Sequence, residues 1–260
     1  MSHSVRSPIS APEADRPRFD GPVSTVLIAH TPRSGSTLLA WALGDTGLCG
    51  VPHEYLNFVH MRDFRTRIGD LPVPSLMAWL KLHRTTPNGV FCIKASAHQI
   101  QHEVLEQNLP LRPLFAPLRC VWIQRADKVR QAVSYTRAVQ TDRWNSEAEA
   151  RQEAHYDYDH IERSLRFILI QTRNWPKLFG MLGVSPIQVQ YQQLIRHYEA
   201  TVRSVVGALG LAAPMDVSIA PPRQKRMPNL HSREWCTRFR AEATSKGVNP
   251  RLFGPEEPWT

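Results

Sequence analysis

The chain has 260 residues, of which 42% are hydrophobic and 21% charged, and its formal net charge of +9 at pH 7 favours an anionic partner. Its four cysteines lie far apart and form no C-x-x-C pair, which argues against a disulfide scaffold and a zinc ribbon. Uninterrupted aliphatic and aromatic runs, such as residues 167–170, are far below the ~20 residues that a membrane-spanning helix needs.

The N-terminal segment differs in composition from the rest of the chain. Its first eighteen residues lack an apolar core and contain proline, serine, arginine and acidic residues. We therefore expect residues 1–20 to form a disordered leader rather than a signal peptide, and the protein to be cytoplasmic. No linker divides the remainder, so residues 21–260 are expected to form one domain.

The most informative segment is an apolar strand followed by a short polar loop and an apolar helix. Residues 26–29 are suited to a strand buried on both faces, residues 32–37 read Pro-Arg-Ser-Gly-Ser-Thr, and a helical pattern starts at residue 38. A strand, loop and helix in this order direct unpaired backbone amides and the positive helix end toward an anion. The segment therefore predicts a phosphate-binding loop.

The loop departs from the nucleotide triphosphate pattern G-x-x-x-x-G-K-[ST]. With Gly35 as its second glycine, His30 replaces the first glycine and Ser36 the lysine, while Thr37 keeps the hydroxyl. The cation is Arg33, and a guanidinium binds phosphate or sulfate bidentately. We expect a phosphate-type ester here rather than magnesium-dependent phosphoryl transfer. An ordinary turn that caps a helix is the alternative.

Strands and helices alternate along the rest of the chain. We expect strands at residues 90–93, 118–123 and 187–189. Helices are expected at residues 75–84 and 194–209, and a further helix should start after Asp127, which can cap it. The longest helix is expected to run from the capping box of Ser146 and Glu149 to about Asn174, and a short helix is expected after Ser232. Trp175-Pro176 sets the expected end of the longest helix. The alternation predicts a single α/β, P-loop-like domain with a central, mainly parallel sheet flanked by helices and its ligand at the carboxyl ends of the strands.

The loop after the first strand resembles the 5′-phosphosulfate loop of sulfotransferases that use 3′-phosphoadenosine-5′-phosphosulfate (PAPS). Further segments resemble the bacterial trehalose 2-sulfotransferase type: residues 50–55, 86–90 with Lys94, 131–134 and 137–141, and later Tyr191, Leu194, residues 223–224 and residues 234–235. The resemblance covers about residues 24–245 and implies a PAPS-dependent sulfotransferase without a metal. Enzymes of this kind commonly form homodimers.

The resemblance also implies how the donor is held. The 5′-phosphosulfate is assigned to Arg33, Ser34, Gly35, Ser36 and Thr37. The 3′-phosphate is assigned to Arg125 and Ser134, which lie nine residues apart as in the trehalose-type sequences. A helix serine bonding its own backbone is the alternative for Ser134. Arg223 matches a C-terminal block that covers the cofactor.

Glu54 is the expected general base, because Pro52-His53-Glu54 aligns with the P-x-E segment of the trehalose-type enzymes. His53 is its rival, since histidine serves as the base in many other sulfotransferases and titrates near neutrality. Adjacent residues of an extended backbone point opposite ways, so only one of the two can face the donor. Lys94 matches a family lysine that could reach the acceptor or the transferring group, and a surface lysine is the equally weighted alternative.

The acceptor is less defined than the donor. Where the trehalose-type pattern has a second carboxylate, three residues before the base, this chain has Val51. We therefore expect a carbohydrate or glycolipid acceptor without naming trehalose, and a small natural-product alcohol is the alternative. A P-loop kinase and a non-catalytic anion-binding relative are rival functions. No nucleic-acid motif accompanies the arginines. His98 and His102 have metal-pair spacing, but no third ligand is in register with them, so no metal is expected.

Overall fold

The computed structural model describes residues 8–144, 151–212, 216–223 and 230–257. Its sheet has four parallel strands, β1 (Ser24–His30), β2 (Val90–Ser96), β3 (Leu118–Gln124) and β4 (Ile187–Gln190), in the order β2-β1-β3-β4. The predicted α/β architecture with a parallel central sheet is therefore confirmed. Because His30 pairs with Ser96 and Gln124 with Gln190, all four strands end at the same edge of the sheet.

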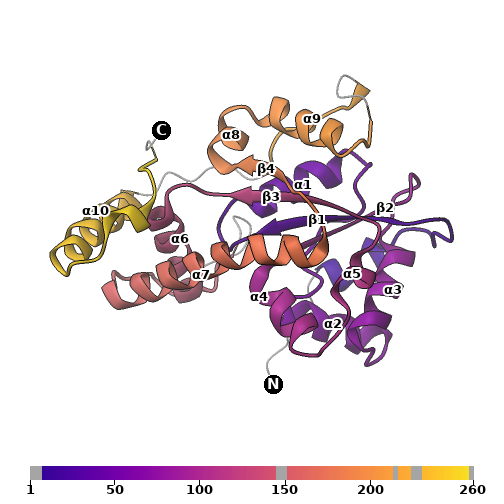
Figure 1. The fold of residues 1–260 in the computed structure, drawn as a ribbon, viewed down its shortest axis with the longest axis horizontal. Coiled ribbons are helices and arrows are strands. Elements are labelled where there is room, and N and C mark those ends of the chain that lie inside the picture. The colour runs from indigo at the N-terminus through magenta and orange to yellow at the C-terminus, as the bar shows by residue number, and fades with distance from the viewer. Residues whose placement is uncertain (1–7, 145–150, 213–215, 224–229, 258–260) are drawn as a thin grey trace.

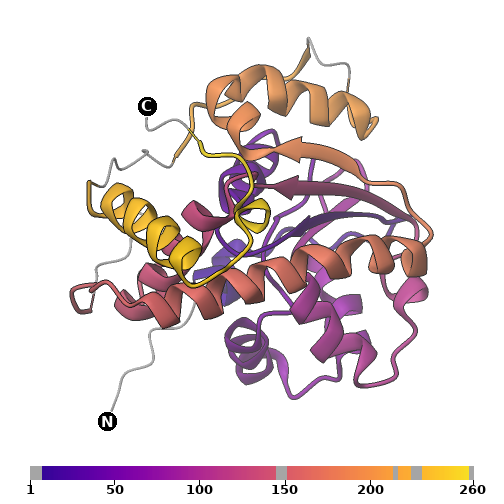
Figure 2. The ribbon, with the colours of Figure 1, turned by 60° about the vertical axis from the view of Figure 1, so that its left-hand side comes forward.

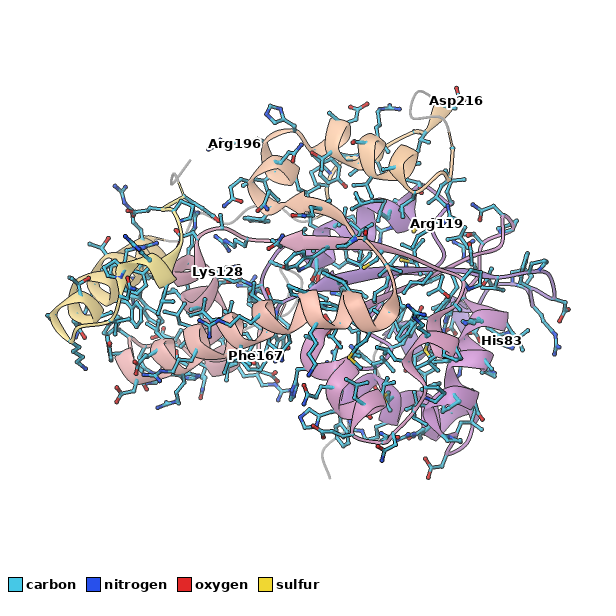
Figure 3. All side chains as sticks on the ribbon, in the orientation of Figure 1. His83, Arg119, Lys128, Phe167, Arg196 and Asp216 are labelled. Atoms are coloured by element: carbon cyan, nitrogen blue, oxygen red, sulfur yellow. The ribbon has the colours of Figure 1, made fainter. Side chains whose placement is uncertain are left out.

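Helices cover both faces of this sheet (Figure 1). They are α1 (Ser36–Asp45), α2 (Phe58–Ile68), α3 (Val73–His83), α4 (Ala97–Ile100), α5 (Leu111–Phe115), α6 (Lys128–Thr141), α7 (Tyr158–Leu182), α8 (Tyr191–Arg196), α9 (Tyr198–Ala208) and α10 (Leu230–Ser245). Side chains occupy the space between the sheet and both helical layers (Figure 3). In the described part of the chain, no helix is both long and apolar enough to cross a membrane.

The strands have two buried faces because alternate residues of β1 enter different cores. Leu27 and Ala29 pack with α2, α3, α5 and the end of α7, whereas Val26 and Ile28 pack with α1 and α9. This explains the continuous apolar run of the sequence, since a parallel strand covered on both faces has no polar side. A third core, which includes Val133, joins α6, α7 and α10 beyond the sheet.

Helix α7 differs from its predicted limits at both ends. It begins at Tyr158, where the Asp157 side chain accepts a hydrogen bond from the His160 amide at 2.9 Å, and Ser146 and Glu149 lie outside the described residues. The predicted end near Asn174 is wrong, because the helix continues through Pro176 to Leu182. Trp175 is fully buried and its indole N–H donates to the His30 carbonyl at 2.9 Å, so packing holds the helix beyond the proline.

Three other expectations also need correction. The single helix predicted over residues 194–209 is two helices, because the backbone of His197 (φ −130°, ψ 51°) interrupts it. Helix α10 has 16 residues and is longer than the short helix expected after Ser232. The described part of the predicted leader makes tertiary contacts: Asp15 forms ion pairs with Arg67 at 2.8 Å and Arg84 at 2.7 Å.

Candidate active site

The predicted phosphate loop connects β1 to α1 at the carboxyl edge of the sheet. Arg33 (φ 64°) and Gly35 (φ 89°) both adopt left-handed backbone conformations, and Gly35 is the N-cap of α1. A Cβ atom at position 35 would overlap the ring of Tyr191, so the loop needs glycine both for its conformation and for this close approach. The helix therefore begins with its free amides facing the strand ends.

A cavity of about 470 Å³ adjoins the loop. It is lined by Arg33, Gly35, Ser36, Thr37, Leu38, Arg125, Ser134, Trp144, Tyr191, Ile195, Tyr198 and Pro222. Most residues predicted to hold the donor therefore meet around one space, although they come from the loop after β1 and the start of α1, from the end of β3 and from α6. Ser34 does not line the cavity; it is fully buried and its hydroxyl has no hydrogen-bond partner among the described residues.

The charge of the cavity is set by two arginines. Arg33 donates from Nε to the Ser134 hydroxyl at 3.0 Å and from Nη1 to the Trp144 carbonyl, and no carboxylate in the described ranges pairs with it. Burial and then the positive charge of Arg125 lower the pKa of Arg33. Like charges in a partly enclosed space repel each other, so an anion between them would be stabilised.

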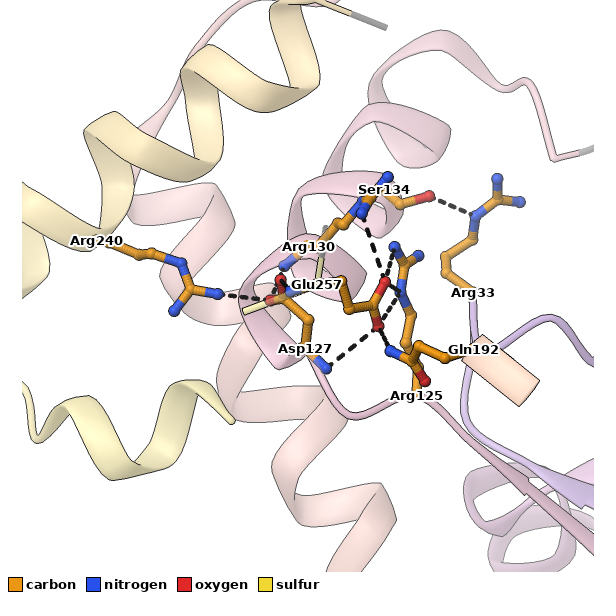
Figure 4. Close-up of polar contacts among 8 residues, drawn as sticks. All are labelled: Arg33, Arg125, Asp127, Arg130, Ser134, Gln192, Arg240 and Glu257. Carbon is orange, nitrogen blue, oxygen red and sulfur yellow. Dashed lines mark hydrogen bonds and ion pairs between the residues drawn. The ribbon is translucent and has the colours of Figure 1, made fainter. Parts of the chain in front are cut away.

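Arg125 follows β3 and is held by a different set of contacts (Figure 4). Its guanidinium lies 4.7 Å from the centre of the Tyr191 ring and donates to the Glu257 carboxylate, with an Nη2–Oε2 distance of 3.0 Å. Glu257 also accepts from the Asp127 backbone amide at 3.3 Å and from the Gln192 side-chain amide. Arg125 thus lines the cavity while a buried carboxylate contacts it.

Glu54 lies in the loop that precedes α2, and four side chains surround its carboxylate. Lys94 Nζ is 3.0 Å and His30 Nε2 is 3.5 Å from Oε1, while Gln99 donates to Oε2 at 3.1 Å and Asn57 at 3.4 Å. Burial opposes ionisation of Glu54, but the charge and hydrogen bond of Lys94, together with His30 and His53, outweigh it and hold the pKa of the carboxyl well below its usual range. Glu54 is therefore a carboxylate at neutral pH.

Lys94 joins this carboxylate to the phosphate loop. The side chain is 6% exposed, and its ammonium lies 2.9 Å from the Thr37 hydroxyl as well as 3.0 Å from Glu54. β2 places Lys94 there because it pairs in register with β1, whose end leads into the loop. A carboxylate, an ammonium and a loop hydroxyl therefore form one chain of contacts.

His53, the alternative base, has a different environment from its neighbour Glu54. Its backbone bridges to β2 through the Lys94 amide, which donates to the His53 carbonyl at 2.9 Å. Its ring meets the His60 ring edge to face at 4.5 Å. Burial, with the nearby His60 and Lys94, lowers the pKa of His53 to about 3. The imidazole is thus neutral and packed against α2.

Arg223, which is predicted to bind the cofactor, is not among the residues that line the cavity, and neither are His98 and His102. The Arg223 guanidinium pairs with Asp45, with an Nε–Oδ2 distance of 2.9 Å, and Gln224 lies outside the described residues. His98 and His102 stack edge to face at 4.2 Å, and His102 pairs with Glu106 at 2.7 Å. Within the described ranges, no three His, Cys, Asp or Glu side chains are arranged to hold a metal ion.

Sequence reasoning missed several polar residues of this region, and Gln99 and Glu257 illustrate why. Gln99 could have been found from the local sequence, because Ser96 and Gln99 have the spacing of a capping box and form one at α4. The Gln99 side chain accepts a hydrogen bond from the Ser96 amide through its oxygen and donates one to Glu54 through its nitrogen. Glu257 has no local signal, since it contacts Arg125 across 132 residues of sequence. A capping motif can be found by its spacing, whereas a long-range ion pair cannot.

Comparisons with known proteins match nearly the whole chain. The family described as "Stf0 sulphotransferase" matches residues 25–242. A trehalose 2-sulfotransferase of Mycobacterium tuberculosis (strain ATCC 35801 / TMC 107 / Erdman) is 32% identical over 87% of this chain and 98% of its own length. A trehalose 2-sulfotransferase of Mycolicibacterium smegmatis (strain ATCC 700084 / mc(2)155) is 29% identical over 88% of this chain and 98% of its own length. Among solved structures, the sulfotransferase domain from the Synechococcus PCC 7002 olefin synthase is 15% identical over 85% of this chain and 97% of its own, with a TM-score of 0.45.

Proposed function

The chain belongs to the Stf0 sulphotransferase family, whose members are PAPS-dependent sulfotransferases, and from this membership we propose that it sulfates a carbohydrate hydroxyl with Glu54 as general base. The observation that carries the proposal is the bridge made by Lys94. Its ammonium contacts both Glu54 and Thr37, so the carboxylate is one side chain away from the loop assigned to the donor. Membership in this family also argues against a P-loop kinase.

The residues around the cavity suit a donor with anionic groups at both ends. Arg33 and the loop amides would hold the phosphosulfate end, and Arg125 with Ser134 the 3′-phosphate. The support is that these side chains line one cavity of about 470 Å³ and that Arg33 has no acidic partner among the described residues. When bound, PAPS supplies an electrophilic sulfuryl group. Arg33 and Lys94 supply positive charge beside the loop, and we propose that no metal ion is needed.

Glu54 has the properties that a base in this position requires. It is ionised at neutral pH, its Oε2 is oriented by Gln99, and the bond from Asn57, at 3.4 Å, is the longer of the two hydrogen bonds to Oε2. An acceptor hydroxyl that replaced Asn57 would donate its proton to Oε2, while Lys94 stays on Oε1. His53 is a neutral imidazole whose ring packs against His60, so we assign it to the lining of the site rather than to proton transfer.

Trehalose is the first acceptor to test, because both relatives carry its name. Val51 nevertheless stands where the resemblance expects a carboxylate, and a site without that hydrogen-bonding group should recognise a different set of hydroxyls. We therefore propose a saccharide or glycolipid acceptor. Labelled PAPS offered to trehalose, other disaccharides and glycolipid extracts, with ATP and magnesium in a parallel reaction, would identify the acceptor.

The test of the base compares Glu54→Gln with His53→Asn. Glu54→Gln keeps the shape of the side chain but cannot accept a proton at neutral pH, so kcat should fall by about 10²–10⁴-fold while donor affinity changes little. His53→Asn should act mainly on KM. If His53→Asn abolishes turnover while Glu54→Gln stays within about threefold of wild type, the two residues exchange roles.

A further inference from the structure

The carboxylate of Glu257 is the centre of a buried polar cluster beside the cavity (Figure 4). It accepts hydrogen bonds from Arg125 Nε at 3.2 Å and Nη2 at 3.0 Å, from the Asp127 amide at 3.3 Å and from the Gln192 side chain, and Arg130 Nη1 lies 3.6 Å away. Glu257 is only 4% exposed. Because the family match ends at residue 242, neither the match nor the resemblance assigns this residue a role.

The C-terminal segment that carries Glu257 is anchored in the fold. After α10 it runs back to the carboxyl ends of the strands (Figure 2). Phe253 is 3% exposed and belongs to the core shared by α6, α7 and α10. Gly254 has φ 70°, and a Cβ there would overlap the Ala126 carbonyl oxygen. The Glu257 amide donates to Asp127 Oδ2 at 3.1 Å, so backbone and side chain are both held.

Glu257 contacts one edge of the Arg125 guanidinium and leaves another edge available. A guanidinium offers one donor pair through Nε and Nη2 and a second through Nη1 and Nη2. Glu257 takes the first pair, and the ring of Tyr191 covers a face at 4.7 Å. Arg125 lines the cavity but Glu257 does not. The carboxylate therefore holds the Nε–Nη2 edge from outside the cavity lining, and Nη1 forms no hydrogen bond within the described residues.

We propose that Glu257 is a positioning residue for recognition of the donor's 3′-phosphate, acting through Arg125. The inference rests on the proposed function, because it needs Arg125 to bind that phosphate. Glu257 holds the guanidinium in one rotamer, with its second donor edge presented beside Ser134, so that a phosphate meets two aligned donors without an ordering cost. An alternative with the opposite consequence is that the carboxylate competes with the phosphate for Arg125.

The test measures binding of 3′,5′-adenosine diphosphate and of 5′-AMP by calorimetry, so it needs no acceptor. In Glu257→Gln the preference for the 3′-phosphorylated nucleotide should fall by about tenfold, because the charge-assisted contact that orients Arg125 is weakened. Glu257→Asp keeps the charge but shortens the side chain, and it should lose preference as well. Glu256→Gln is the matched control, since its neighbouring side chain is exposed; it should leave the preference unchanged.

The measured direction separates the two roles of the carboxylate. Removing a competing anion would tighten binding of 3′,5′-adenosine diphosphate in Glu257→Gln, and an unchanged or raised preference overturns the positioning role. In an Arg125→Ala background, Glu257→Gln should cause no further loss, because the two residues act as one unit. If Glu257→Gln does not fold, the nucleotide preference of Glu257→Asp is the deciding measurement: a lower preference supports the positioning role, and an unchanged or raised one overturns it. If wild type itself binds both nucleotides equally, the 3′-phosphate assignment fails, and the inference with it.

Discussion

Acidification from about pH 7 to about pH 5 should destabilise the folded protein through two buried histidines, His30 and His53. Burial is the main reason why the pKa of His30 falls from 6.5 to about 4; Glu54 opposes this shift and the charge of Lys94 adds to it. Burial, then His60 and Lys94, lower the pKa of His53 from 6.5 to about 3. Both rings are therefore neutral in the fold under conditions where the unfolded chain binds protons.

The magnitude follows from proton linkage. A group whose folded pKa lies below its unfolded value contributes its full stability above the unfolded pKa, here 6.5, and loses it as the pH falls toward the folded pKa. Between about pH 7 and about pH 5 each histidine should cost about 2 kcal/mol of unfolding free energy. Glu54 adds nothing in this window, because its lowered pKa contributes stability that is lost only below the unfolded value of 4.5.

The assay is urea unfolding at both pH values for wild type, His30→Asn and His53→Asn, with the free energy obtained by linear extrapolation. Each substitution should reduce the difference between the two pH values by about 2 kcal/mol, whatever it does to stability at neutral pH. His231→Asn is the control, because that side chain is 77% exposed. If the free energy of unfolding of both variants changes with pH as much as that of wild type, the two rings do not cause the pH dependence, and the reasoning from burial is refuted.

Four further outcomes can be measured with the same protein. Lys94→Met should lower the free energy of unfolding in urea by about 3 kcal/mol, because it leaves the buried Glu54 carboxylate without its ion-pair partner. Adding Glu54→Gln should restore most of the lost free energy, and additive losses in the double variant would contradict a coupled pair. Gly35→Ala should abolish the thermal shift given by 3′,5′-adenosine diphosphate, because a methyl group overlaps the Tyr191 ring; a wild-type shift would show that the loop adapts. Asp157→Ala should cost about 1 kcal/mol through loss of the N-cap of α7, and an unchanged unfolding midpoint would deny the cap a role. Sulfuryl transfer should proceed undiminished in excess EDTA, and a strict magnesium requirement would contradict the metal-free site.

The sequence alone determined the elements whose signals are local. The apolar run of β1, the loop from Arg33 to Thr37 and the cap of α6 by Asp127 were all readable, because burial on both faces, a glycine turn and an N-cap each depend on a few adjacent residues. Parallel pairing then follows from the alternation of strands and helices, and it brings the strand ends to one edge. The loop, Arg125 and Ser134 accordingly line one cavity.

The tertiary structure decided what depends on contacts between distant segments. Helix α7 passes Pro176 because Trp175 is buried and bonded to the His30 carbonyl, although the local preference is to stop. Lys94 reaches both Glu54 and Thr37 only once β2 lies beside β1. Arg125 meets Glu257 across 132 residues. Such pairs leave no periodic trace along the chain, because packing free energy, and not local backbone preference, selects them.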